Sequence, residues 1–244
     1  MSARVHLVGG GWQSGEVFQD FLRDAGTRPR VGCVLVDEGE PGVVQGEFER
    51  YAARLVAAAP CTPVALTVPV EGRFDLAALD TIDALLVCGG LTPAYQEVFA
   101  DCAADLPGLL AERAVPYAGF SAGAVVAAAD AVVGGWLDRG VPVCPADSAE
   151  DLDEITVRPG LGLVPFAVEV HAAQWGTLGR QISTVGRGRV RRAVALDEDT
   201  LITYAPGEPV RVAGRGQAHL VSATDDGVRV RSYAAGQTFD AAWA

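Results

Sequence analysis

Short apolar runs alternate with helical patterns through the first half of the chain. The runs are five to seven residues long and almost continuously apolar, which is typical of parallel strands covered on both faces. We expect strands at residues 4–8, 31–36, 63–68, 82–88 and 115–119. We expect helices from about residue 14 and over residues 48–58, 76–79, 94–114 (broken near Pro107) and 122–133. This half therefore predicts an α/β fold.

The pattern changes in the second half. Residues 134–160 are rich in Gly, Pro and acidic residues, which favours a long loop. A strand is expected at 166–170 and a helix at 176–185, followed by short strand-like runs at 192–196, 201–204, 210–212, 218–221 and 227–233. The spacing of these runs predicts antiparallel strands that close the edge of the sheet. Because no linker composition separates the halves, we expect one domain over residues 1–244.

Composition narrows the range of functions. The chain of 244 residues carries 19 basic and 31 acidic residues, a formal net charge of −12. This balance argues against binding to nucleic acid or to anionic membrane surfaces. All the cationic side chains are arginine, so chemistry that needs a lysine, such as a Schiff base or a pyridoxal-phosphate anchor, is excluded. No signal peptide or membrane-spanning run is evident, and we expect a cytoplasmic protein.

The cysteines and histidines do not indicate a metal centre or a disulfide framework. Five cysteines are widely spaced without a C-x-x-C pair, and they are typical of buried thiols in a reducing compartment. Only three histidines are present, and they lie far apart in the sequence. We therefore expect no metal. The cysteines are Cys33, Cys61, Cys88, Cys102 and Cys144, and the histidines are His6, His171 and His219.

One segment carries the pattern of a catalytic nucleophile. A G-x-S-x-G sequence centred on Ser121 lies between an expected strand and a helix of small residues. Gly119 and Gly123 would give room for a tight, strained turn that exposes the hydroxyl. Ala122 would offer a backbone N–H at the positive end of the helix. The alternative is that Ser121 only caps the helix, which serine does often.

A serine nucleophile needs a base and an orienting acid. His171 follows an apolar strand at its carboxyl end, where open α/β sheets place their sites, whereas His6 and His219 have the surroundings of structural histidines. By elimination we predict His171 as the base. The acid stays open among Asp138, Glu169 and the cluster at residues 197–199. If the strand before this cluster runs beside the strand before His171, Glu198 would lie close to the imidazole.

The block around Ser121 and several others, given at the end of this paragraph, resemble the dipeptidase E and cyanophycinase family of serine peptidases. They occur in the same order as in that family. The resemblance spans roughly residues 5–221 and implies a class I glutamine-amidotransferase-like fold. This fold is a flavodoxin-like three-layer sandwich, here with a mainly parallel sheet and antiparallel edge strands near the C-terminus. The family uses a Ser–His–acid arrangement without metal or organic cofactor. The blocks are Val87-Cys88-Gly89-Gly90, Gly119-Phe120-Ser121-Ala122-Gly123-Ala124, the run 159–165, His171-Ala172-Ala173-Gln174, Leu178-Gly179-Arg180 and Leu196-Asp197-Glu198-Asp199-Thr200.

The resemblance implies roles for individual residues. Ser121 matches the nucleophile and His171 the base, and the N–H groups of Gly90 and Ala122 would form the oxyanion hole. Glu198 falls at the position of the downstream acid. The earlier acid of the family has no clean counterpart: Trp136 lies near its place, and the nearest carboxylate is that of Asp138, which we keep as the alternative acid.

The departures from the family concern the substrate. Trp175 and Thr177 replace two arginines that bind the charged polymer in cyanophycinases, and only Arg180 remains. Dipeptidase E removes N-terminal Asp from short peptides, but no acid-binding pocket is evident here. We name Arg180, Gln174 and Thr92 as candidate substrate-binding residues; Arg180 would bind a carboxylate through both of its terminal nitrogens.

These observations predict a cofactor-independent serine hydrolase that cleaves amide bonds in small peptides. One alternative is a cyanophycinase-type hydrolase of Asp-Arg peptides, and another is a binding protein that has lost turnover. A third alternative takes Gly9-Gly10-Gly11 as a nucleotide-binding loop, but the run lacks the G-x-G-x-x-G spacing. The expected partner is a small peptide, and a homodimer is compatible with the sequence.

Overall fold

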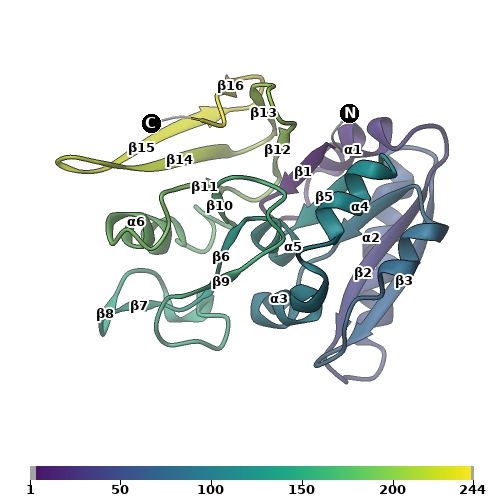
Figure 1. Ribbon diagram of the computed structural model, residues 1–244, viewed down its shortest axis with the longest axis horizontal. Coiled ribbons are helices and arrows are strands. Elements are labelled where there is room, and N and C mark those ends of the chain that lie inside the picture. Colours follow the sequence, from purple (N-terminus) through teal and green to yellow (C-terminus); the bar gives the residue numbers. More distant parts are fainter. Residues whose placement is uncertain (1–3, 243–244) are drawn as a thin grey trace.

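The computed structural model describes residues 4–242 and contains a central eight-stranded sheet (Figure 1). Five strands run parallel in the order β3-β2-β4-β5-β1, and three antiparallel strands extend the sheet beyond β1 in the order β12-β13-β16. The parallel strands are β1 (Val5–Val8), β2 (Arg30–Asp37), β3 (Thr62–Pro69), β4 (Ala84–Val87) and β5 (Tyr117–Phe120). The antiparallel strands are β12 (Thr200–Tyr204), β13 (Val210–Gly214) and β16 (Thr238–Phe239).

Helices cover both faces of this sheet, as the predicted three-layer architecture requires. Successive residues of a strand enter different core clusters: Val31 and Cys33 pack with α1 and α2, whereas Val34 packs with α3 and α4 on the other face. This is why the parallel strands are apolar at nearly every position. The helices are α1 (Gln19–Asp24), α2 (Val43–Ala58), α3 (Thr92–Phe99), α4 (Leu106–Glu112), α5 (Ala122–Val126) and α6 (Leu178–Gly186). Short 3₁₀ turns cover Gly15–Phe18, Leu76–Thr81, Ala100–Cys102 and Ala146–Ser148.

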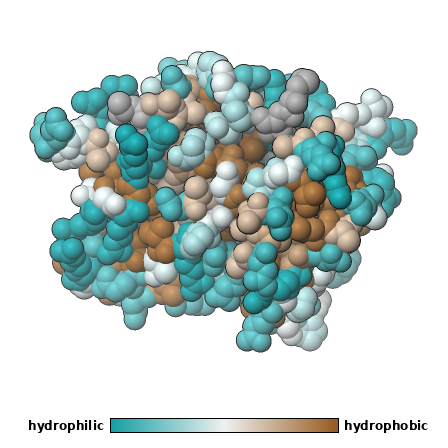
Figure 2. Space-filling model, in the orientation of Figure 1, coloured by the Kyte–Doolittle hydropathy of each residue, from teal (hydrophilic) through white to brown (hydrophobic). Residues whose placement is uncertain are grey.

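The predicted break near Pro107 is confirmed, because α3 ends at Phe99 and α4 begins at Leu106 with a proline in its first turn. Such a proline lacks only an N–H that would have had no acceptor there. No helix within residues 4–242 combines the length and the apolar character needed to cross a membrane. On the face shown in Figure 2, hydrophilic side chains dominate the outline and hydrophobic ones lie between them.

Not all the late strands close the edge of the central sheet as the sequence analysis expected. Four strands form a second sheet in the order β10-β11-β14-β15, in which only β10 and β11 are parallel. The alternating pattern identifies a strand but not its partner, since pairing depends on distant segments. The strands are β10 (Ala167–Glu169), β11 (Arg192–Leu196), β14 (Gln217–Thr224) and β15 (Gly227–Ala234).

The expected helix over residues 122–133 is too long. Helix α5 ends at Val126, and the chain continues as β6 (Asp130–Gly134), which pairs with β9 (Thr156–Pro159). A continuous apolar run fits either a buried helix or a buried strand, so its periodicity could not locate this change. The expected loop that follows holds two further short strands, β7 (Leu137–Asp138) and β8 (Val141–Pro142).

Candidate active site

Ser121 occupies a strained turn between β5 and α5. Its backbone angles are φ 51° and ψ −114°, outside the regions that L-residues prefer. A Cβ atom at Gly119 would collide with the backbone of Gly123, and a Cβ at Gly123 would collide with the carbonyl oxygen of Val87. The two glycines therefore allow the turn to pack against β4, as the sequence analysis expected.

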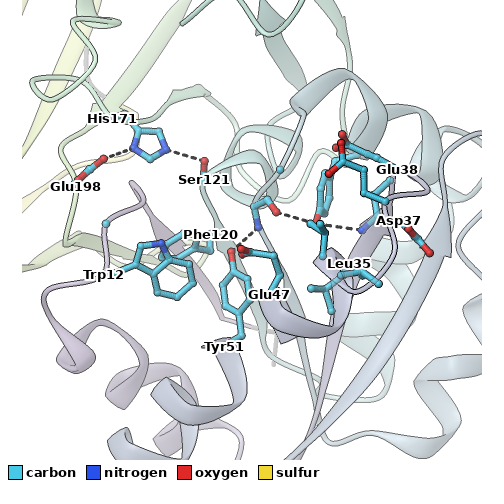
Figure 3. Close-up of a pocket in the computed structure, with 18 of the residues that line it drawn as sticks. Trp12, Leu35, Asp37, Glu38, Glu47, Tyr51, Phe120, Ser121, His171 and Glu198 are labelled. Carbon is cyan, nitrogen blue, oxygen red and sulfur yellow. Dashed lines mark hydrogen bonds and ion pairs between the residues drawn. The ribbon is translucent and has the colours of Figure 1, made fainter. Parts of the chain in front are cut away.

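Ser121, His171 and Glu198 form a continuous chain of hydrogen bonds (Figure 3). The Oγ atom of Ser121 lies 2.8 Å from Nε2 of His171, and Nδ1 of His171 lies 2.8 Å from Oε1 of Glu198. His171 follows the carboxyl end of β10 and Glu198 follows that of β11. Because β10 and β11 are parallel neighbours, their carboxyl-terminal turns lie side by side, which is the pairing that the sequence suggested.

The glycine run after β1 brings the histidine and the acid against the serine. A side chain at Gly10 would collide with the imidazole of His171, and one at Gly11 would lie 2.8 Å from Cβ of Glu198. The backbone is tied by hydrogen bonds from the N–H of His171 to the oxygen of Gly9 (3.0 Å) and from that of Asp199 to the oxygen of Gly10 (2.7 Å). The structure thus gives this run a packing role, and nothing in this geometry supports a nucleotide-binding loop.

Trp175 stacks on the imidazole of His171, a contact that the sequence analysis did not identify. The ring centroids are 3.8 Å apart and the planes differ by 7°. The indole shields one face of the imidazole from water and offers its π-system to the imidazolium cation. The sequence places an aromatic residue four positions after this histidine, but such a spacing is common and does not by itself indicate that the two rings stack.

Burial lowers the pKa of His171, although the hydrogen bond that it donates to Glu198 acts in the opposite direction. The neutral imidazole is therefore the prevailing form at neutral pH. In this form Nδ1 donates its proton to Glu198, and Nε2 is free to accept the proton of the Ser121 hydroxyl.

The two residues expected to form the oxyanion hole, Gly90 and Ala122, lie at the site: Ala122 follows Ser121 in the chain, and Gly90 lines the same cavity. Ala122 is the first residue of α5, so its N–H has no acceptor within the helix. Gly90 follows β4 and lines the same cavity as Ser121. Gly89, the residue before Gly90, is held by two tyrosines. Its N–H donates to the hydroxyl of Tyr51 (2.8 Å), and the hydroxyl of Tyr95 donates to its carbonyl (3.0 Å).

The three side chains line a cavity of about 690 Å³ at the carboxyl ends of β1, β2, β4 and β5. From β2 the chain passes to β3 at the edge of the sheet and then returns to β4 on the other side of β2; crevices at such switch points bind ligands in open α/β sheets. Its floor is aromatic, with Trp12 centred 4.7 Å from Phe120 and 4.8 Å from Tyr51. The cavity has the size of a small-ligand site.

Arg180, expected to bind substrate, does not line this cavity. Its guanidinium holds both carboxylate oxygens of Glu169, at 2.8 and 2.9 Å, and also donates to the carbonyls of Gly135 and Ser148. The side chain is only 4% exposed. The sequence analysis expected Arg180 to bind a carboxylate through two nitrogens. The structure shows such a contact, but the carboxylate belongs to the protein itself, because Arg180 lies on the buried face of α6.

The other sequence candidates also have different positions from those expected. Thr92 is buried and its N–H donates to Glu150 (2.8 Å), and the amide oxygen of Gln174 accepts from the N–H of Glu198 (2.9 Å). Neither residue lines a cavity at Ser121. Each forms a hydrogen bond with another residue of the protein instead. Asp138, the alternative acid, accepts hydrogen bonds from Ser183 and Arg187, and His171 is bonded to Glu198 instead.

A serine on a strand–helix turn, joined through histidine to a carboxylate in an α/β fold, is the arrangement of serine hydrolases. No protein-family profile and no curated protein matches the chain. Among solved structures, a peptidase from an acI-B1 Actinobacterium has a TM-score of 0.65 at 14% identity, covering 98% of this chain and 97% of that one. A candidate peptidase E from Listeria monocytogenes EGD-e has a TM-score of 0.58 at 17% identity, covering 88% and 99%. The chain therefore has the fold of peptidase E-like proteins, which confirms the resemblance at the level of the fold.

Proposed function

We propose that this protein is a cofactor-independent serine hydrolase that cleaves amide bonds in small peptides. The observation that carries the proposal is the hydrogen-bonded chain from Ser121 through His171 to Glu198 at the wall of a ligand-sized cavity. The fold of two solved structures described as peptidases supports the same reaction class.

In the proposed reaction each of these groups has a role. The Oγ of Ser121 attacks the substrate carbonyl carbon while Nε2 of His171 takes the hydroxyl proton. His171 then gives this proton to the leaving amine as the C–N bond breaks, which leaves an ester on Ser121. A water molecule, deprotonated by the same nitrogen, cleaves the ester and restores the serine. Glu198 holds the imidazole in the required tautomer and stabilises its cationic form.

The negative oxygen of the tetrahedral intermediate would be bound by the N–H groups of Gly90 and Ala122. Such a donor typically contributes about 3 kcal/mol to stabilisation of the transition state. The position of Ala122 at the start of α5 adds the positive end of a short helix.

The two alternatives from the sequence have less support. A cyanophycinase-type site would need cations to hold acidic groups, and the one retained arginine, Arg180, is committed to Glu169. A binding protein without turnover would not require the strained turn at Ser121 or its hydrogen bond to His171.

A fluorophosphonate probe tests whether the serine is activated. We expect it to label the protein at Ser121, because this serine lies on a strained turn at the wall of the cavity and has a base at 2.8 Å, whereas Ser232, which also contacts a histidine, does not line this cavity. Intact-mass and peptide mass spectrometry would locate the adduct. The Ser121→Ala variant should stay unlabelled and the Ser232→Ala variant should label normally. A folded wild-type protein that resists the probe would contradict the proposal.

The pKa of His171 predicts the acid side of the pH profile. The base must be neutral, and burial holds the pKa of this histidine below its ordinary value of about 6.5. We therefore expect kcat/KM for peptide hydrolysis to rise with pH through a midpoint below about 6.5 and to be near its plateau at pH 7. Measured rates from pH 4.5 to 8 would check this, and a midpoint above that value would contradict it.

A further inference from the structure

Two cavities meet at Ser121, and acidic residues line both. The larger, of about 690 Å³, is lined by Asp37 at the end of β2, Glu38 directly after it and Glu47 on α2. A second, of about 520 Å³, is lined by Asp147, Glu150 and Asp151. Both share Ser121, Gly90, Trp175 and Glu38, so a substrate bound across the serine would lie between two groups of carboxylates.

No arginine of the described residues lines either cavity, and the chain has no lysine. Arg50 is the nearby cation that the structure shows; it lies 3.4 Å from Glu47 and over the ring of Trp12. Glu47 is therefore partly neutralised. Among the described residues, no ion pair engages the other lining carboxylates apart from Glu198, which binds His171; the unpaired ones are Asp37, Glu38, Glu40, Asp147, Glu150 and Asp151.

The walls between the carboxylates are apolar. Leu35, Val43 and Val44 line the larger cavity beside the aromatic floor of Trp12, Tyr51 and Phe120. Figure 3 shows Asp37 and Glu38 on the opposite side of the view from Ser121 and His171, and Trp12, Phe120 and Tyr51 below the serine. A side chain that reaches from the serine to these carboxylates must be long, apolar along its stem and cationic at its tip, which describes arginine and lysine.

We propose that the substrates are short peptides with a basic side chain next to the cleaved bond, and that Glu38 is a determinant of this specificity. The inference rests on the proposed function and specifies its substrate class. An acidic substrate, such as a peptide with N-terminal Asp, would bring a negative charge among unpaired carboxylates, and such like-charge contacts weaken binding. The proposal therefore separates this protein from the preference for N-terminal Asp that belongs to dipeptidase E.

The test uses short alanine peptides that carry arginine, citrulline or glutamate at one position at a time. Citrulline has nearly the shape of arginine but no charge, so the pair isolates the electrostatic contribution. At the position next to the cleaved bond we expect kcat/KM to be about tenfold or more higher for arginine than for citrulline, and lowest for glutamate. The preference should fall as salt is added, because the carboxylates are partly exposed.

Variants locate the preference. Glu38→Gln should lower the ratio of kcat/KM for arginine to that for citrulline by about threefold or more. Asp225→Asn removes an equal charge from an exposed position on the hairpin of β14 and β15, and it should keep the wild-type ratio. Equal rates for arginine and citrulline in an active, Ser121-dependent enzyme would overturn the inference and leave the proposed function standing.

Binding to the Ser121→Ala variant separates the two proposals. Fluorescence anisotropy with labelled arginine and citrulline peptides measures selectivity without turnover. Tighter binding of the arginine peptide supports the inference even if the wild-type protein hydrolyses neither peptide. Absence of hydrolysis would contradict the proposed function alone. Equal affinity for the two peptides, or no binding of either, would overturn the inference.

Discussion

The Ser121→Ala variant is expected to lose peptide hydrolysis almost completely, with kcat reduced by about five to six orders of magnitude. The methyl group cannot attack the carbonyl, so the covalent route through His171 and Glu198 is lost as a whole. Only positioning of the substrate and any stabilisation of the oxyanion would remain, and together these supply a modest acceleration over water. Release of product from quenched peptides, measured at high enzyme concentration, would check this.

The matched control is Ser232→Ala, which removes an exposed serine on β15 that contacts His219. This variant should hydrolyse the same peptides at the wild-type rate. Circular dichroism of both variants would show whether the fold persists. Equal rates for the wild-type protein and a folded Ser121→Ala variant would show that this serine is not the nucleophile.

The local sequence pattern was sufficient to predict those structural elements that a single segment of the chain determines. The turn at Ser121 could be predicted because its two glycines, the preceding strand and the small residues of α5 are contiguous. His171 and Glu198 required one further rule, that parallel neighbours end at the same edge of a sheet. Their partnership was one option among several until the pairing of β10 with β11 selected it.

Features that depend on orientation could not be predicted in this way. Arg180 lies seven residues after Ala173 and nine after His171. These separations do not determine whether its side chain points to the interior or to the surface. Its buried contact with Glu169 arises from the packing of α6 against the second sheet, which was itself unexpected. The unpaired carboxylates around the two cavities lie at the end of β2, in the segment that follows it, and between β8 and β9, and acidic residues in such segments are ordinarily just solvated.

Replacing Glu198 with glutamine is expected to lower kcat for peptide hydrolysis by about four orders of magnitude. The amide has nearly the shape of the carboxylate, but its NH₂ group can donate to Nδ1 of His171. That contact favours the tautomer with the proton on Nε2, which then cannot accept the proton of Ser121. The amide also provides no negative charge to stabilise the imidazolium. Steady-state kinetics at pH 7 would measure the loss.

Asp138→Asn is the matched control, because it makes the same change in the other carboxylate considered as the acid. Asp138 holds Arg187 at 2.7 Å and Arg189 at 3.3 Å, so its loss should weaken the packing of this region and lower the melting temperature. It should leave kcat within a few-fold of wild type, since His171 is bonded to Glu198. If Asp138→Asn abolished turnover in a folded protein while Glu198→Gln retained it, the acid would have been misassigned. A carboxylate must touch the imidazole to hold its tautomer and to stabilise its cation, and this pair of variants separates that contact from general loss of stability.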